Sequence, residues 1–165
     1  MNIFFSFITL IMIPILLSGC VSLSIGNDKV TKPKGVIYSA PSNPFSLGKT
    51  DSGDNLWISK STGNSISFFA ECSTGLDKKL ETLESDSLSV LSHPEIISRS
   101  KENFNGRDAL MTEAKGTVDG VLIGIQTLSF NKNGCSYTLT YVGILSKLTS
   151  EKNHFTQFIS HFRAP

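Results

Sequence analysis

The sequence of 165 residues has almost no surplus of charge of either sign, and this limits what the protein can bind. Lysine and arginine together number 15 and aspartate and glutamate 14, which gives a net charge of +1. Both signs are scattered along the chain, so no basic run or stripe favours nucleic-acid binding, and no acidic tail is present. We therefore expect no nucleic-acid partner.

The sequence also lacks the common motifs of catalysis and metal binding. His93, His154 and His161 do not share a metal-ligand spacing such as His-Glu-x-x-His, and no serine lies in a Gly-x-Ser-x-Gly elbow. Residues 51–55 resemble the start of a calcium loop but lack the later glycine and the terminal glutamate of an EF-hand. We predict no metal, no cofactor and no catalytic residue, and we favour a binding protein over an enzyme.

The longest apolar segment, from Ile3 to Leu16, is shorter than the ~20 residues of a transmembrane helix and contains Pro14. It ends in Leu17-Ser18-Gly19-Cys20, which resembles the lipobox of bacterial lipoproteins. The resemblance implies that residues 1–19 are a signal peptide that is removed and that Cys20 becomes the lipid-bearing first residue. An ordinary cleaved signal is less favoured, because no Ala-x-Ala-like site lies near Cys20. One departure is that the segment before the apolar run has no lysine or arginine.

The same resemblance implies a lipid bilayer as the partner of the chain. In these lipoproteins the cysteine thiol carries diacylglycerol and its freed amine usually receives an acyl chain such as palmitate. Two or more chains make anchoring stable, because each buried CH₂ contributes about 0.8 kcal/mol. Val21 stands where enteric lipoproteins of the inner membrane have Asp, which points to the outer membrane and to a domain that faces the periplasm.

Composition divides the mature chain into a tether and one domain. Residues 20–43 contain Gly26, Pro33 and Gly35 among small polar residues, a pattern typical of a flexible linker. Lysines in this stretch are typical of a solvated linker as well. Residues 44–165 have a length that suits a single globular domain with one hydrophobic core.

Alternating apolar residues predict strands in this domain. Residues 55–59 and 65–72 each have a strand pattern, and the loop formers at 61–64 between them favour a hairpin. We assign Trp57 to the core, since a single tryptophan in a strand is more often buried than an interface anchor. Four further strands are predicted at 95–104, 108–118, 121–130 and 135–143. Asn105-Gly106, Asp119-Gly120 and Asn133-Gly134 separate them, and such pairs favour type I′ turns and hence a β-meander.

Two segments have helical periodicity. Leu76, Leu80, Leu83, Val90 and Leu91 recur at helical spacing, with Thr74 as the expected N-cap and Pro94 beyond the end. The second helix is expected after Thr149-Ser150. Its apolar stripe consists of Phe155, Phe158, Ile159 and Phe162, and we expect His154 and His161 at the edge of this stripe.

These elements predict an α+β fold, an antiparallel β-meander sheet packed against two helices. Residues 106–110, 119–121 and 133–137 resemble small uncharacterised bacterial lipoproteins that are similar to the PsbP-like fold. The resemblance covers about residues 55–162. Its motifs are turns and core positions, so it implies a fold and assigns no site.

Two cysteines remain if Cys20 is lipidated. Cys72 ends one predicted strand and Cys135 begins another, both on apolar faces. In an exported protein such a pair favours a disulfide, with two buried free thiols as the alternative. A redox couple is less favoured, because Cys-x-x-Cys spacing is absent.

Two classes of function remain open. The first is a non-enzymatic binding or scaffold module displayed on a lipid tether, with an unidentified protein partner. The second is a small-molecule-binding protein or hydrolase whose site is assembled from side chains distant in sequence. A deep pocket with convergent histidine, serine and acidic groups favours the second, and a shallow surface with an exposed apolar or charged patch favours the first. Arg107 and Asp108, beside a turn, are expected to be surface charges.

Overall fold

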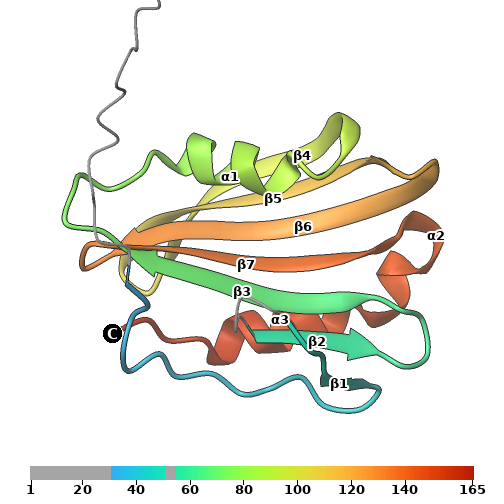
Figure 1. Cartoon of the computed structure of the whole chain (residues 1–165), viewed down its shortest axis with the longest axis horizontal. Coiled ribbons are helices and arrows are strands. Elements are labelled where there is room, and N and C mark those ends of the chain that lie inside the picture. The colour runs from blue at the N-terminus through green and yellow to red at the C-terminus, as the bar shows by residue number, and fades with distance from the viewer. Residues whose placement is uncertain (1–30, 51–54) are drawn as a thin grey trace, which may run out of the picture.

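The centre of the domain is an antiparallel sheet with the strand order β1-β2-β3-β7-β6-β5-β4 (Figure 1). The structure is a computed structural model that describes residues 31–50 and 55–165. The strands in this part of the chain are β1 (Phe45–Leu47), β2 (Asn55–Ser59), β3 (Ser65–Cys72), β4 (Ser92–Phe104), β5 (Arg107–Val118), β6 (Val121–Lys132) and β7 (Cys135–Ile144). The predicted hairpin and the predicted meander of four strands are both confirmed.

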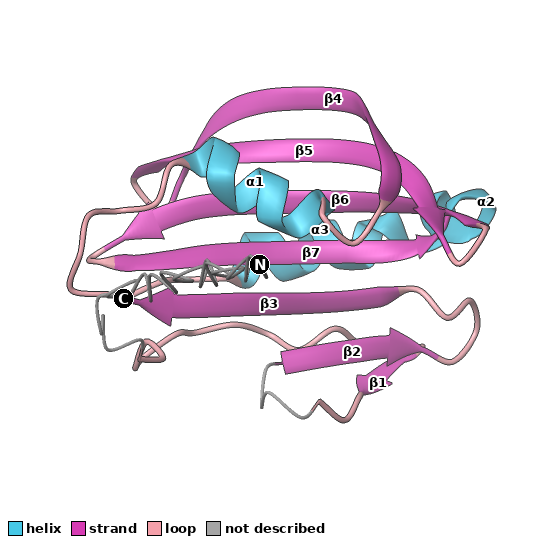
Figure 2. Ribbon diagram, turned by 45° about the horizontal axis from the view of Figure 1, so that its top comes forward, coloured by secondary structure: helices cyan, strands magenta, loops and turns pink. Residues whose placement is uncertain are grey.

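Helices lie on both faces of this sheet. α1 (Leu80–Leu88) lies on one face and α3 (Lys152–His161) on the other, as Figure 2 shows. α2 (Leu145–Leu148) and the 3₁₀ turn η1 (Thr149–Glu151) connect β7 to α3. The predicted α+β class with two main helices is therefore confirmed for the described residues.

The three turns of the meander have the backbone that their sequences predict. Both central residues of each turn have a positive φ, from 49° at Asp119 to 79° at Gly120. Asparagine, aspartate and glycine tolerate this left-handed region better than other residues do. The turn sequences therefore set the register between consecutive strands.

The α3 face holds the main core, which consists largely of aromatic rings. Ile66, Phe68, Leu139, Phe155 and Phe158 lie together in it, as predicted, and Trp57 is buried there as well. The rings of Phe130 and Tyr137 stack with centroids 4.8 Å apart, and Phe68 meets Phe162 edge to face at 5.2 Å. The alternation along β3 and β7 therefore places every second side chain on this face.

The opposite face of the sheet holds a second apolar cluster, in addition to the one core that the length of the domain suggested. A smaller apolar cluster of Leu88, Leu91, Ala114 and Ile125 lies under one end of α1. Along β6, residues 124–130 are buried on both faces, because α1 lies on one side and the aromatic core on the other.

The start of α1 also differs from the prediction. The helix begins at Leu80 with Lys79 as N-cap, and no side chain caps it, so Thr74 does not have the predicted role. Leu76 is 96% exposed, and Val90 is exposed after the helix. The N–H of Ser73 donates to the carbonyl of Gly134 (3.1 Å), so the chain is still bound to the β6–β7 turn there.

Residues 31–43 belong to the stretch expected to be a flexible tether, and for them that expectation is wrong. Thr31 pairs with Cys72 through two backbone hydrogen bonds (3.1 and 2.8 Å), and Ile37 pairs with Arg163 (3.0 and 2.7 Å). Tyr38 packs edge to face against Phe68, with ring centroids 5.1 Å apart. This segment covers part of the aromatic core, and partial burial of Val36 and Tyr38 helps to hold it in place.

The predicted signal peptide 1–19, Cys20 and the tether as far as residue 30 lie outside the described residues, as do residues 51–54 of the stretch that resembles a calcium loop. In the described ranges, the helices are too short or too polar to cross a membrane.

Candidate functional site

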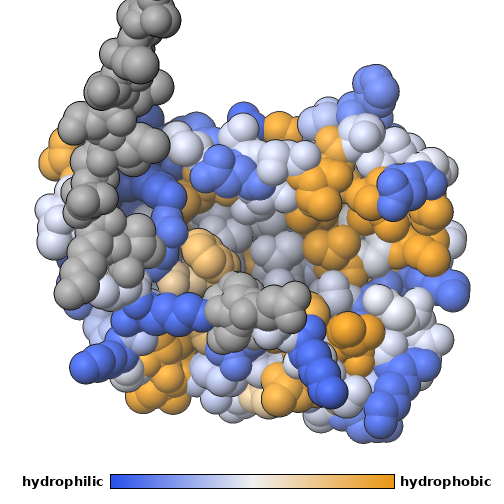
Figure 3. All heavy atoms as spheres, viewed as in Figure 1, coloured by the Kyte–Doolittle hydropathy of each residue, from blue (hydrophilic) through white to orange (hydrophobic). Residues whose placement is uncertain are grey.

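An open groove lies between α1 and the strands β3 and β7, because α1 covers β5 and β6 and leaves the neighbouring strands uncovered. We call it the α1 groove; its volume is about 270 Å³. In Figure 3 the surface between α1 and β3 is hollowed and nearly white, with orange apolar side chains beside it. The lining residues are Phe69, Glu71, Lys78, Leu83, Asp86, Ser87, Ser136, Thr138 and Thr140.

The floor of the α1 groove is a row of hydroxyl groups on β7. Ser136, Thr138 and Thr140 occupy alternate positions, so they share one face and repeat every ~6.8 Å along the strand. The Ser136 hydroxyl donates to Asn131 Oδ1 (2.7 Å), and Thr138 lies 3.5 Å from the hydroxyl of Ser129. A hydroxyl is both a donor and an acceptor, so this floor can bind polar ligand groups of either kind.

An aromatic side chain forms one wall of the groove. Phe69 is paired with Thr138 across the β3–β7 ladder and is 47% exposed. Leu83 of α1 lines the opposite wall. An exposed ring beside a row of hydroxyls combines apolar contact area with hydrogen-bonding groups, which is typical of a binding surface.

Charged groups lie at the rims. The ammonium of Lys78 forms an ion pair with Glu71 at one end of the groove, and Asp86 projects from α1. An ion pair this close to solvent contributes at most ~1 kcal/mol to stability. Lys78 and Glu71 can therefore exchange their mutual ion pair for contacts with a bound partner at a small cost in free energy.

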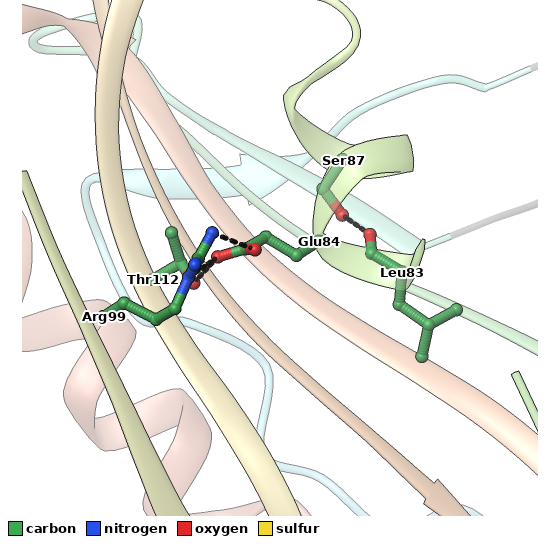
Figure 4. A network of polar contacts seen from close by, with 5 residues as sticks. All are labelled: Leu83, Glu84, Ser87, Arg99 and Thr112. Carbon is green, nitrogen blue, oxygen red and sulfur yellow. Dashed lines mark hydrogen bonds and ion pairs between the residues drawn. The ribbon is translucent and has the colours of Figure 1, made fainter. Parts of the chain in front are cut away.

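An ion pair between a buried glutamate and a half-exposed arginine holds α1 against the sheet and so sets the width of the groove (Figure 4). Glu84 of α1 is only 4% exposed. Its two carboxylate oxygens accept hydrogen bonds from Arg99 Nε (2.8 Å) and Nη2 (2.6 Å) of β4, and the hydroxyl of Thr112 on β5 donates to the same carboxylate. This bidentate geometry restricts the position of the helix.

The histidines lie away from the α1 groove. His93 is exposed at the start of β4 with a φ of 53°, and His161 is exposed at the end of α3. His154 is half-buried with its ring 5.2 Å from that of Phe45, an edge position like the one predicted. Arg107 and Asp108 are exposed at the turn before β5. Within residues 31–50 and 55–165, no three His, Cys, Asp or Glu side chains are grouped for a metal ion.

A buried polar network on the α3 face involves the most strongly shifted tyrosine. Burial raises the pKa of Tyr141 to about 12; the negative charge of Glu151 raises it as well, and a hydrogen bond from Asn64 lowers it. The Tyr141 hydroxyl donates to the carbonyl of Leu148 (2.6 Å). A phenol held neutral in this way supports packing and is unsuited to act as a base near neutral pH.

The same network fastens the β2–β3 hairpin to the C-terminal helices. Glu151 accepts hydrogen bonds from Ser59 (2.7 Å), Thr62 (2.6 Å) and Asn64 (3.1 Å). A Cβ atom at Gly143 would clash with the Asn64 amide, so glycine there makes room for it. Sequence reasoning missed this network, since its members are separated by up to 92 residues.

The two cysteines meet at the end of the β3–β7 ladder. Cys72 and Cys135 are direct partners, and their Sγ atoms lie 2.07 Å apart, the distance of a disulfide.

The floor residues of the α1 groove carried only a weak sequence signal. Ser136, Thr138 and Thr140 alternate with apolar residues in the sequence, but nothing in it indicated that α1 would leave their face half open.

Comparisons with known proteins support the fold. No protein-family model and no curated protein matches the chain. The crystal structure of LpqN, involved in cell envelope biogenesis of Mycobacterium tuberculosis, is similar with a TM-score of 0.61 at 10% identity and covers 86% of this chain and 88% of its own. The solution structure of cyanobacterial PsbP (CyanoP) from Synechocystis sp. PCC 6803 has a TM-score of 0.59 at 14% identity and covers 90% and 99%. These likenesses show a PsbP-like fold.

Proposed function

We propose that this protein is a non-enzymatic binding module of the bacterial cell envelope, anchored through lipid on Cys20, and that it presents the α1 groove to a binding partner. The observation that carries this proposal is the open groove itself, with hydroxyl groups on its floor, an exposed ring on its wall and charges at its rims. Small polar groups around an apolar contact are suited to recognition.

The cell-envelope location rests on two independent supports. The lipobox pattern at residues 17–20 indicates lipid attachment to Cys20, and LpqN, which has the same fold, is a protein of cell envelope biogenesis. Lipid on Cys20 would hold the domain near the bilayer, because the eleven residues 20–30 span at most ~40 Å even when extended. Val21 favours the outer membrane, with the domain facing the periplasm.

The chemistry of the groove favours binding over turnover. A serine or threonine becomes a nucleophile when a base lies within hydrogen-bond reach and a third group orients that base. In the groove the hydroxyls of Ser136 and Thr138 bond an amide oxygen and another hydroxyl, and the three histidines lie elsewhere. These contacts are those of a hydrogen-bonding floor.

The anchor is tested by fractionation and by mass spectrometry of the natively expressed protein. We expect the protein in the membrane fraction with an acylated N-terminal Cys20, and the Cys20→Ser variant as a soluble or uncleaved form. Cys72→Ser is the matched control, which should remain in the membrane fraction. An unmodified N-terminus before residue 20 would contradict the anchor.

The groove is tested with a photo-crosslinking residue placed at Thr138 or, as a control, at the exposed Gln157 of α3. We expect one discrete adduct from position 138 in living cells and its loss when Phe69→Ser is combined with the crosslinker. Equal adducts from both positions would contradict a role of the groove. Reproducible turnover in an esterase, peptidase and thiol-oxidoreductase panel, abolished by one substitution in the groove, would replace the binding function with the hydrolase alternative.

A further inference from the structure

A second cleft lies on the opposite face of the sheet, between α3 and the strands β4 and β5. We call it the α3 cleft; its volume is about 240 Å³. It exists because α3 packs over β3 and β7 and leaves the other half of this face uncovered. The residues that determine its chemistry are Met111, Glu113, Gln126, Lys152, Phe155 and Ile159.

Apolar side chains form the long walls of the α3 cleft. Phe155 and Ile159 lie one turn apart on α3, and Met111 of β5 faces them from the sheet. Phe155 is buried, whereas Met111 and Ile159 are partly buried at the edge of the aromatic core. A short hydrocarbon chain can fill this space and gain ~0.8 kcal/mol per buried CH₂.

One end of the cleft is closed by a carboxylate that a buried amide orients. Glu113 is on the same face of β5 as Met111, and its side chain is 31% exposed. Its Oε2 atom accepts a hydrogen bond from Gln126 Nε2 (2.8 Å), and Gln126 is only 5% exposed. The amide therefore holds the carboxylate in position before any ligand arrives.

The existing counter-ion of this carboxylate is weakly held. Lys152 Nζ lies 3.2 Å from Glu113 Oε2, and the lysine side chain is 49% exposed. Such an ion pair contributes at most ~1 kcal/mol. Gln126 and Lys152 both contact Oε2 of Glu113, so Oε1 offers a further acceptor position. The ammonium of Lys152 can be displaced into solvent.

We propose that the α3 cleft binds a small ammonium compound with a short hydrocarbon chain. The ammonium group donates to the carboxylate of Glu113, and the chain lies between Met111, Phe155 and Ile159. A carboxylate at the end of an apolar cleft selects a cation over a neutral or anionic group of the same size, because only the cation forms a charge-assisted hydrogen bond there. This site is separate from the α1 groove and does not depend on the function proposed for that groove.

A single methionine makes the cleft directly observable. Met111 is the only methionine after Cys20. In ¹³C-methyl-methionine-labelled full-length protein, which also contains Met1 and Met12, Met111→Leu identifies the signal that reports on the cleft. Butylammonium, 1-butanol and butyrate are titrated at pH 7, where an alkylamine with a pKa of about 10.4 is protonated. We expect the Met111 methyl signal to shift with butylammonium at about tenfold lower concentration than with 1-butanol, and butyrate to have the weakest effect.

Three variants separate this proposal from simple apolar binding. Glu113→Gln should remove the preference for butylammonium, whereas Glu81→Gln, an exposed carboxylate on α1, should leave it unchanged. Lys152→Met should strengthen butylammonium binding up to about fivefold by removing the competing ammonium. Equal affinity for butylammonium and 1-butanol, or an absence of shifts at Met111, would overturn the proposal. A preference that persists in Glu113→Gln would overturn it as well.

Discussion

The α3 face and the α1 face of the same sheet are filled by different interactions. On the α3 face, rings from β2, β3, β6, β7 and α3 pack together, and Phe130, Tyr137 and Phe158 are completely or almost completely buried. On the α1 face, a smaller apolar cluster lies under one end of the helix, and an ion pair between the buried Glu84 and the half-exposed Arg99 holds the rest. Strand β7 shows the difference within one element, because Tyr137, Leu139 and Tyr141 lie on the α3 face and Ser136, Thr138 and Thr140 on the α1 face.

This difference separates stability from binding. Apolar area removed from water contributes most of the stability of a domain, so the α3 face carries the fold. Hydroxyl groups lose little when they remain hydrated, so half of the α1 face can stay open as a groove. If the uncovered half of the α1 face carried apolar side chains instead, it would be an exposed apolar patch that promotes aggregation.

The largest expected effect comes from deleting a core ring. Phe158→Ala should lower the free energy of unfolding by about 3–5 kcal/mol, because it removes buried area and leaves a cavity. Phe69→Ala, on the α1 face, should cost under ~1 kcal/mol, because its ring is half exposed. Urea denaturation of both variants measures this contrast, and similar losses would mean that the two faces share the stabilising role.

The cysteine pair lies on the β3–β7 seam that both faces share. Replacing Cys72 and Cys135 together by serine should lower stability by about 2–4 kcal/mol, since the bridge closes a loop across 63 residues in the unfolded chain. Thermal unfolding under oxidising and reducing conditions compares the wild type with the double variant. Non-reducing peptide mapping should recover the linked pair, and two free thiols in natively exported protein would rule it out.

The ion pair under α1 should respond asymmetrically to substitution. Arg99→Met leaves the Glu84 carboxylate buried without its cation and should cost about 2–3 kcal/mol. Glu84→Gln should cost less, because the half-exposed Arg99 can return to water and Thr112 can still donate a hydrogen bond. The denaturation midpoints of the two variants show which substitution lowers stability more. A larger loss of stability for Glu84→Gln would show that the attachment of α1 depends on the negative charge of Glu84.

The polar network of the α3 face predicts a pH effect at the alkaline end. The folded-state pKa of Tyr141 is raised from 10.0 to about 12, so the folded protein retains a proton that the unfolded chain loses. Its contribution is therefore complete below pH 10 and is lost as the pH rises towards 12. Tyr141→Phe should cost about 1–2 kcal/mol near neutral pH and should flatten this part of the stability profile. A profile unchanged by the substitution would contradict the assignment.

The smallest expected effect is on the groove floor. Thr138→Val keeps the shape of the side chain and removes one hydroxyl from a hydrated surface, so the change in stability should stay within ~0.5 kcal/mol. The crosslinked adduct from a neighbouring position in the groove should nevertheless weaken. If Thr138→Val lowers stability and the crosslinked adduct persists, the hydroxyl groups on β7 stabilise the fold and do not bind the partner.

Much of the fold follows from local sequence. The alternation in β3 and β7 and the Asn-Gly and Asp-Gly pairs predicted the strands, their hairpins and the buried faces, because period-two patterning and positive φ are properties of a few neighbouring residues. Phe155 and Phe158 likewise predicted the apolar stripe of α3. The pairing of Cys72 with Cys135 followed from counting the cysteines that remain beside Cys20.

Other features were decided only by tertiary structure. Leu76 has the spacing of a helix residue, but Ser73 just before it is bonded to the β6–β7 turn, and α1 begins only at Leu80. Tyr38 stands in a linker-like sequence but packs on a core made of strands and a helix far along the chain. The α1 groove and the α3 cleft arise because each helix covers only half of its face. How far a helix lies across a sheet depends on contacts between residues distant in sequence, and local propensity contains no information about them.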